Sequence, residues 1–204
     1  MTNTSVWRQS VHLARLHLAS RRASAALAVL AVCAAMLWPA SHWRWGASGD
    51  AAPRQLPLLI EAAAAAVIAV TMYNPFGEAE RAVGRWLPWL RLGSALALTA
   101  AAAALLAFAT TGGRLPGGST QLLRDLAGMT GIGLICATVL GGLLAWIGPV
   151  SYGLLAGFTL SGAWTSPWLW PARPPDDRGA ALCAGLVFAA GLAMTTLRGA
   201  RTTN

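Results

Sequence analysis

The chain carries little charge for its length. Only 11% of its 204 residues are charged, whereas an average soluble domain has roughly 25%. Another 56% are hydrophobic, and these residues are gathered into long runs, which excludes an ordinary water-soluble globule. The composition predicts an all-α polytopic membrane protein, with one transmembrane domain covering residues 1–204.

Lysine is missing, and histidine and cysteine are few. All 15 basic residues are arginine, and the abundant alanine beside them is typical of a high-GC bacterial genome. The net charge of +8 fits arginine held at a cytoplasmic membrane surface better than nucleic-acid binding. The three histidines lie outside the apolar runs, and the three cysteines lie inside them at spacings that suit no metal. No metal site is therefore expected.

Motifs for catalysis and for nucleotide binding are also missing. The sequence holds no Gly-x-Ser-x-Gly nucleophile elbow and no Walker A loop. We therefore expect that the chain is not an enzyme and binds no cofactor itself. If it works with ATP, the ATP and its Mg²⁺ must be bound by a separate subunit. No convincing cleavage site follows the first apolar run, so a removable signal peptide is not expected.

Six apolar runs approach the roughly 20 residues that a helix needs to cross a membrane. The expected spans cover about residues 23–38, 56–72, 92–111, 126–147, 150–170 and 179–197. The fifth run is the weakest, because Gly, Ser, Thr and Pro167 interrupt it. None of the ten tryptophans lies in the middle of a span, which fits their preference for the headgroup level.

Arginine counts give the expected orientation. With the amino terminus inside, the inner segments hold nine arginines and the outer segments six, including Arg124. This bias predicts that both termini are cytoplasmic, in the bacterial cell membrane. Residues 1–22 place Arg8, His12 and Arg15 on one side of a helix and apolar residues beside them. They are expected to form an interfacial helix, the alternative being a frayed tail.

A short charged segment lies between the second and third spans. Asn74 is a good N-cap, Pro75 suits the first helical position, and Glu78 and Glu80 lie near the positive end of the helix dipole. We expect a cytoplasmic helix over residues 75–87, apolar on one face and charged on the other. It either docks a soluble partner or is only a solvated connector.

The amino-acid sequence of this segment resembles that of a known family. Residues 74–92 read NPFGEAERAVGRWLPWLRL. With six spans and an interfacial helix, this stretch resembles the permease subunits of ABC-2-type ATP-binding-cassette exporters. There the helix after the second span is the coupling helix, which sits in a groove of the ATPase. The resemblance assigns ATPase docking to Phe76, Glu78, Glu80, Arg81 and Arg85, the charged side chains facing the ATPase.

The resemblance implies a pump assembled from several subunits. Its partners would be a cytoplasmic ATPase, a second permease copy or paralogue, and membrane lipid, but no nucleic acid. Apolar, alanine-rich walls favour a lipophilic or amphipathic substrate such as an antibiotic, a peptide or a lipid. The chain departs from the best-known members in lacking a sizeable outer domain. The alternatives are a membrane scaffold or immunity protein that transports nothing, and a stand-alone secondary carrier.

Two features within the expected spans are candidates for function. Glu61 is the one acid inside a span, and is either a polar site on the transport path or a rim residue that snorkels or pairs with Arg54. Gly153, Gly157 and Ser161 follow one another at four-residue spacing and so share a helix face. That face serves either contact with a second copy or packing within the chain.

Overall fold

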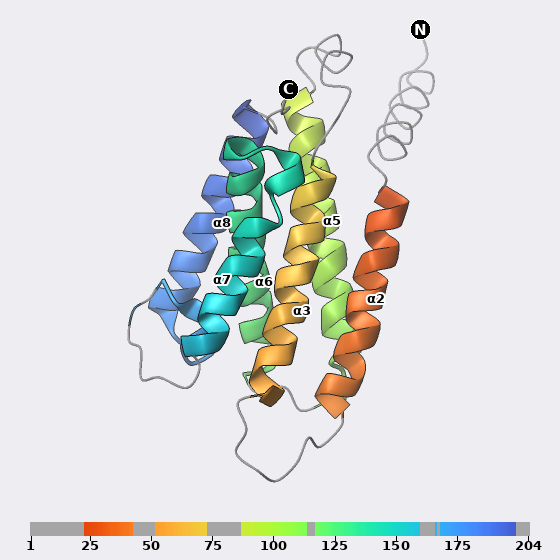
Figure 1. Cartoon of the computed structure of the whole chain (residues 1–204), viewed down its shortest axis with the longest axis vertical. Helices are drawn as coiled ribbons and strands as arrows, with labels where there is room; N and C mark the ends of the chain where they lie inside the picture. Colours follow the sequence, from red (N-terminus) through yellow and green to blue (C-terminus); the bar gives the residue numbers. More distant parts are fainter. Residues whose placement is uncertain are drawn as a thin grey trace, which may run out of the picture.

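The computed structural model describes residues 23–42, 52–72, 87–113, 117–159, 166 and 168–198. Every regular element in these ranges is helical, which confirms the all-α prediction, and the helices stand side by side as a bundle (Figure 1). The α-helices are α2 (Ala23–His42), α3 (Ala52–Thr71), α5 (Leu87–Ala109), α6 (Gly118–Val139), α7 (Ile147–Thr159) and α8 (Arg178–Arg198). Two short 3-10 helices are η2 (Gly142–Leu144) and η3 (Trp170–Ala172).

Five segments of the described chain are long and apolar enough to cross a membrane. They are Ser24–His42, Pro88–Ala109, Gly118–Val139, Gly142–Thr159 and Arg178–Arg198. The expected span at 56–72 falls on α3, whose apolar stretch Gln55–Thr71 is shorter. The structure thus supports a membrane protein with five candidate spans.

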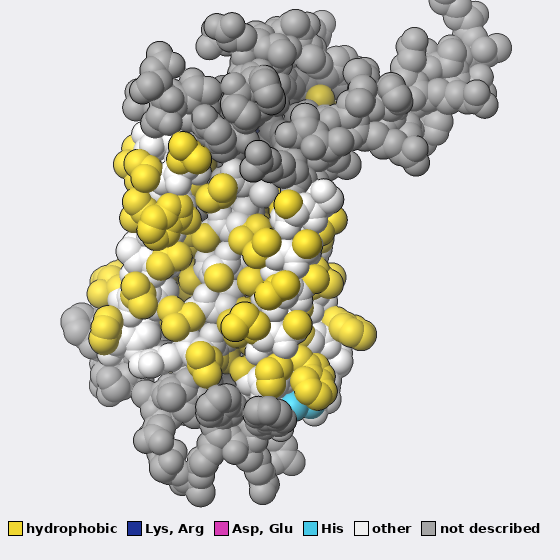
Figure 2. Space-filling view, turned by 45° about the vertical axis from the view of Figure 1, so that its right-hand side comes forward, with side chains coloured by type: hydrophobic (Ala, Val, Ile, Leu, Met, Phe, Trp, Pro, Cys, Tyr) yellow, Lys and Arg dark blue, Asp and Glu magenta, His cyan; other side chains and the backbone are white. Residues whose placement is uncertain are grey.

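The outer surface of the bundle is apolar. Figure 2 shows hydrophobic side chains spread over the middle of one face, with no charged side chain among the described residues in view. Phe108, Leu186 and Leu197 are among the most exposed large side chains. Such a surface suits contact with lipid, because water would leave these side chains unfavourably solvated.

Helix α6 is the central element, in contact with α3, α5, α7 and α8. Its approach to α8 is close enough to require glycine. A Cβ atom on Gly131 would lie 2.6 Å from the backbone of Phe188, and one on Gly191 would lie 2.6 Å from the carbonyl oxygen of Gly131. Small residues let membrane helices approach closely in this way.

The expected break between the fourth and fifth spans is wrong by several residues. The sequence predicted spans at 126–147 and 150–170, but α6 ends at Val139 and α7 covers Ile147–Thr159. Gly141 ends α6 because its φ of 93° is one that glycine adopts readily. Pro149 lies in the first turn of α7, where its missing N–H costs no helical hydrogen bond.

Several predictions lie outside the described residues. These are the interfacial helix at 1–22, the coupling-type helix at 75–87 with Phe76, Glu78, Glu80, Arg81 and Arg85, and Ser161. The ends of the flanking helices are described: α3 ends and α5 begins at the end of the bundle where α8 also ends (Figure 1). The connection 73–86 therefore starts and finishes at that end.

Candidate functional site

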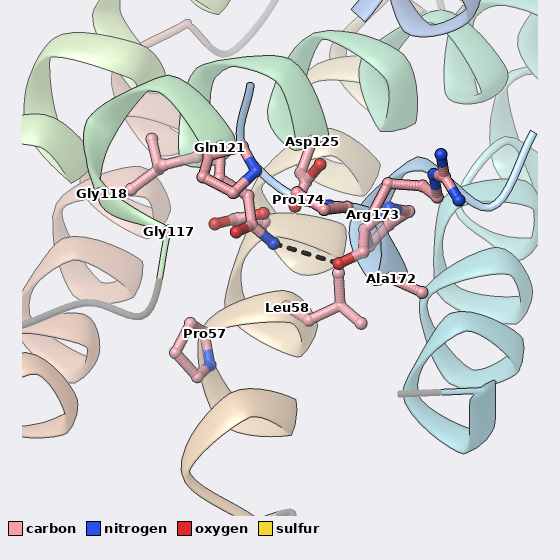
Figure 3. A pocket seen from close by; sticks show the side chains of 13 residues that line it. Pro57, Leu58, Gly117, Gly118, Gln121, Asp125, Ala172, Arg173 and Pro174 are labelled. Atoms are coloured by element: carbon pink, nitrogen blue, oxygen red, sulfur yellow. Dashed lines mark hydrogen bonds between the residues drawn. The ribbon is translucent and has the colours of Figure 1, made fainter. Parts of the chain in front are cut away.

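A pocket of about 390 Å³ opens at the end of the bundle where α3 and α6 begin (Figure 3). Three segments line it: the first half of α3, the start of α6, and the turn that follows η3. Its apolar walls come from Pro57, Leu58, Leu122, Pro171, Ala172, Pro174 and Pro175. Its acidic groups are Glu61 and Asp125.

Arg124 and Asp125 lie inside α6, not in an outer loop. The expectation that Arg124 belongs to an outer connecting segment is wrong, and Asp125 was not expected in a span. The two residues are only 7% and 3% exposed. Arg124 Nε donates to Asp125 Oδ1 at 3.2 Å, so the two charges neutralise one another inside the bundle. Pairing of this kind is what allows ionisable residues to be buried.

The other nitrogens of Arg124 hold the turn after η3. Nη1 donates to the carbonyl oxygen of Pro174 at 2.8 Å, and Nη2 donates to those of Trp170 at 2.6 Å and Arg173 at 3.1 Å. Gln121 Nε2 donates to the Pro171 carbonyl oxygen at 3.0 Å, the dashed line in Figure 3. The carbonyl oxygens of Trp170 and Pro174 also accept backbone N–H groups, from Arg173 and Asp177, so the side-chain bonds add to the turn's own hydrogen bonds. The side-chain bonds also fix one wall of the pocket.

Glu61 is the unpaired acid of the pocket. Its side chain is 4% exposed, so it is buried in the bundle and does not snorkel to the rim. Its Oε2 atom has no hydrogen-bond partner among the described residues. The alternative partner, Arg54, has a side chain outside the described residues. Glu61 and Asp125 line the same pocket, but Arg124 bonds only the latter.

An aromatic pair, Tyr152 of α7 and Trp170 of η3, holds the turn against the helices. Trp170 is 2% exposed, and its ring lies 4.6 Å from that of Tyr152 on α7. The Tyr152 hydroxyl donates to the carbonyl oxygen of Trp168 at 2.6 Å. Gly128 of α6 makes room for the indole, since a Cβ there would lie 2.5 Å from Trp170 Cζ2. Helices α6 and α7 therefore hold the 168–174 turn from two sides.

Asp177 connects this turn to α8. Its Oδ1 accepts the backbone N–H groups of Gly179 at 2.8 Å and Ala180 at 3.2 Å, as an N-cap does. The side chain of Arg173 donates to its other oxygen. The Arg173 hydrogen bond, helped by that from Ala180, holds the pKa of Asp177 below its ordinary value.

The glycines at four-residue spacing in α7 face α3 of the same chain. A Cβ on Gly153 would lie 2.9 Å from the Cβ of Ala62. Gln55 Nε2 donates to the carbonyl oxygen of Gly157 at 3.3 Å. The described part of this face thus packs within the chain.

The pocket combines apolar walls with charged side chains. Within the described ranges no three His, Cys, Asp or Glu residues lie close enough to hold a metal ion. Comparison of the chain with protein families, curated proteins and solved structures finds no match. The lining holds the carboxyl groups of Glu61 and Asp125 and the side chain of Arg173 beside its proline and leucine walls, an arrangement that can hold a polar or cationic group.

The sequence carries one signal for the burial of Arg124 and Asp125. Leu122, Leu126 and Met129 continue the apolar spacing of a helix on both sides of Arg124 and Asp125, and all three are buried. That spacing indicates that the helix starts before the charged pair. The carbonyl partners of Arg124, at 46 to 50 positions along the chain, carry no such signal.

Proposed function

We propose that this chain is the permease subunit of an ATP-driven ABC-2-type exporter in the bacterial cell membrane, with both termini cytoplasmic. The observation that supports this most is the layout of α3. One end of this helix lines the pocket, and the other end leads into the charged connection at 73–86. A helix rises about 1.5 Å per residue, so Glu61 and Thr71, ten positions apart, are separated by about 15 Å along the axis. One rigid element thus joins the two features.

In this proposal α3 also crosses the membrane, as the second span along the chain, and brings the number of spans to six. Its 20 residues make a helix about 30 Å long, which matches the hydrocarbon core. The segment 75–87 is the coupling helix, and closure of the ATPases on ATP pushes it. Because α3 packs against α2, α6 and α7, the push reaches the pocket walls. A second permease copy or paralogue completes the path for a lipophilic or amphipathic substrate.

Affinity purification from the native host in mild detergent tests the proposal. An ATPase with a Walker A loop is expected to accompany the tagged chain. If the chain purifies intact and no ATPase accompanies it, the exporter proposal fails in favour of a membrane scaffold or immunity protein. The scaffold would bind its partner without any dependence on nucleotide.

The burial of Glu61 favours a second candidate, a stand-alone secondary carrier. Carboxylates inside a membrane bundle are common on proton and ion pathways. Such a carrier would move its substrate in proteoliposomes under a proton gradient alone. The permease proposal predicts no transport there until an ATPase and ATP are added.

A further inference from the structure

We propose that the pocket between Glu61 and Asp125 binds an organic cation, an ammonium or guanidinium group carried on a hydrophobic body. The inference rests on the proposed function in one respect, that the bound cation is the exported substrate. The binding itself depends only on the described residues. Four features of the pocket support it: its charge, its unpartnered oxygen, its size and its walls.

Counted as formal charges, with every acid and base ionised, the groups of the pocket leave one negative charge over. Arg124 neutralises Asp125, and its other two guanidinium nitrogens donate hydrogen bonds to three backbone carbonyl oxygens. Arg173 also lines the pocket, but its guanidinium is paired with Asp177 outside the lining. No described cation is left for Glu61. The described part of the pocket therefore leaves room for one further positive charge.

The unpartnered oxygen belongs to the residue that carries this excess charge. Glu61 Oε2 is buried and has no donor among the described residues, while the side chain lines the pocket. A buried carboxylate without a partner is unfavourable, because it has lost its hydrogen bonds to water and has no protein donor in their place. An ammonium or guanidinium group would supply both the opposite charge and the missing N–H donor.

Size and walls indicate an organic cation rather than a bare metal ion. About 390 Å³ lies in the range of roughly 300–1,000 Å³ that is typical of small-molecule pockets. A divalent cation would need about six oxygen ligands. The carbonyls of Trp170, Pro171 and Pro174 already accept from Arg124 or Gln121, and the walls around them are proline and leucine. Apolar walls of this kind favour the hydrophobic part of an amphipathic amine.

Fluorescence anisotropy with ethidium, a hydrophobic monocation, tests the proposal on the purified full chain in detergent without any ATPase. The wild type is expected to bind, and Glu61→Gln to bind at least tenfold more weakly. Asp176→Asn is the matched control. It removes one exposed carboxylate next to the lining segment and should leave binding unchanged. Equal binding by wild type and Glu61→Gln, or none by the wild type, would overturn the proposal.

A competition experiment on the wild type keeps the test independent of folding defects. The amine 4-phenylbutylammonium should displace ethidium, whereas the neutral alcohol 4-phenylbutanol should be at least tenfold less effective. Equal displacement by both would show that charge is not recognised, and would overturn the proposal. Loss of the ATPase in the purification would contradict the exporter alone, because ethidium binding is measured without it.

Discussion

The guanidinium of Arg124 donates a hydrogen bond of 2.6 Å to the carbonyl oxygen of Trp170, 46 positions further along the chain. This bond joins the central helix to the turn that forms one wall of the pocket. With the bonds to Arg173 and Pro174 it holds a non-helical segment inside the end of a helical bundle. Arg124 therefore makes several of the contacts that shape the pocket, together with Gln121 and the Tyr152–Trp170 pair.

Arg124→Ala should strongly destabilise the protein. The change removes every carbonyl contact of the guanidinium and leaves Asp125 buried without its partner. Removing one partner of a buried ion pair typically costs about 3–5 kcal/mol. Unfolding by sodium dodecyl sulfate in mixed micelles would measure the loss. Arg173→Ala is the control, since its ion pair with Asp177 is partly exposed and should matter much less.

Gly131→Ala should separate α6 from α8. The added methyl group would meet the backbone of Phe188, which cannot turn aside as a side chain can. Overpacking of this kind costs about 1–3 kcal/mol, measured as the free energy of unfolding. Gly185→Ala in α8 is the matched control, because nothing lies within 4 Å of its Cβ position. It should be neutral, or stabilising by up to about 1 kcal/mol. Equal losses in both variants would contradict the close approach.

Tyr152→Phe should cost about 0.5–1.5 kcal/mol, the usual worth of one hydrogen bond. The variant loses the bond from the hydroxyl to Trp168 and keeps the ring against Trp170. Tyr152→Ala loses both contacts, and its larger effect should include a rise in the exposure of Trp170. Quenching of tryptophan fluorescence by acrylamide, with and without Trp170→Phe, would report that exposure. Unchanged quenching in Tyr152→Ala would mean that the ring contact does not hold the turn.

Asp177 should make stability depend on acid pH. Its pKa is lower in the folded protein than the ordinary value of 3.8, so the unfolded chain binds the proton more readily. The stabilising contribution is therefore complete above that value and is lost as the pH falls below it. Asp177→Asn keeps an N-cap but cannot titrate. The melting temperatures of wild type and variant should differ at pH 7 and converge as the pH falls through the lowered folded-state pKa of Asp177. A difference that does not change with pH would contradict the assignment.

The sequence predicted the helices whose ends coincide with a change of hydropathy. The run expected at 179–197 is α8 within one residue at each end, and that expected at 23–38 lies inside α2. In these stretches the lipid-facing and core-facing residues are both apolar, so run length alone locates the helix. Because both faces are apolar, the sequence does not show which face is buried, and it could not predict the contact between Gly131 and Gly191.

The sequence placed the start of the fourth span too late, after Arg124 and Asp125, whereas α6 begins at Gly118. Arg124 was counted with an outer loop because arginine is rarely buried, and only contacts distant in sequence make its burial possible. The expected boundary between the fourth and fifth spans was also misplaced, since α6 ends at Val139 and Pro149 lies within the first turn of α7. Glu61 was recognised as a candidate, but its relation to Asp125 depends on how α3 packs against α6. No spacing in the sequence indicates that packing.

The central claim is that residues 75–87 dock an ATPase, and a comparative purification tests it most directly. The tagged wild type, Glu78→Ala/Arg81→Ala and the control Arg8→Ala/Arg15→Ala would be purified from the native host. The control also removes two charges from an expected inner segment, but not from the docking segment. We predict that the ATPase accompanies the wild type and the control and is lost from Glu78→Ala/Arg81→Ala. An ATPase that stays with all three proteins, or accompanies none, would contradict the claim.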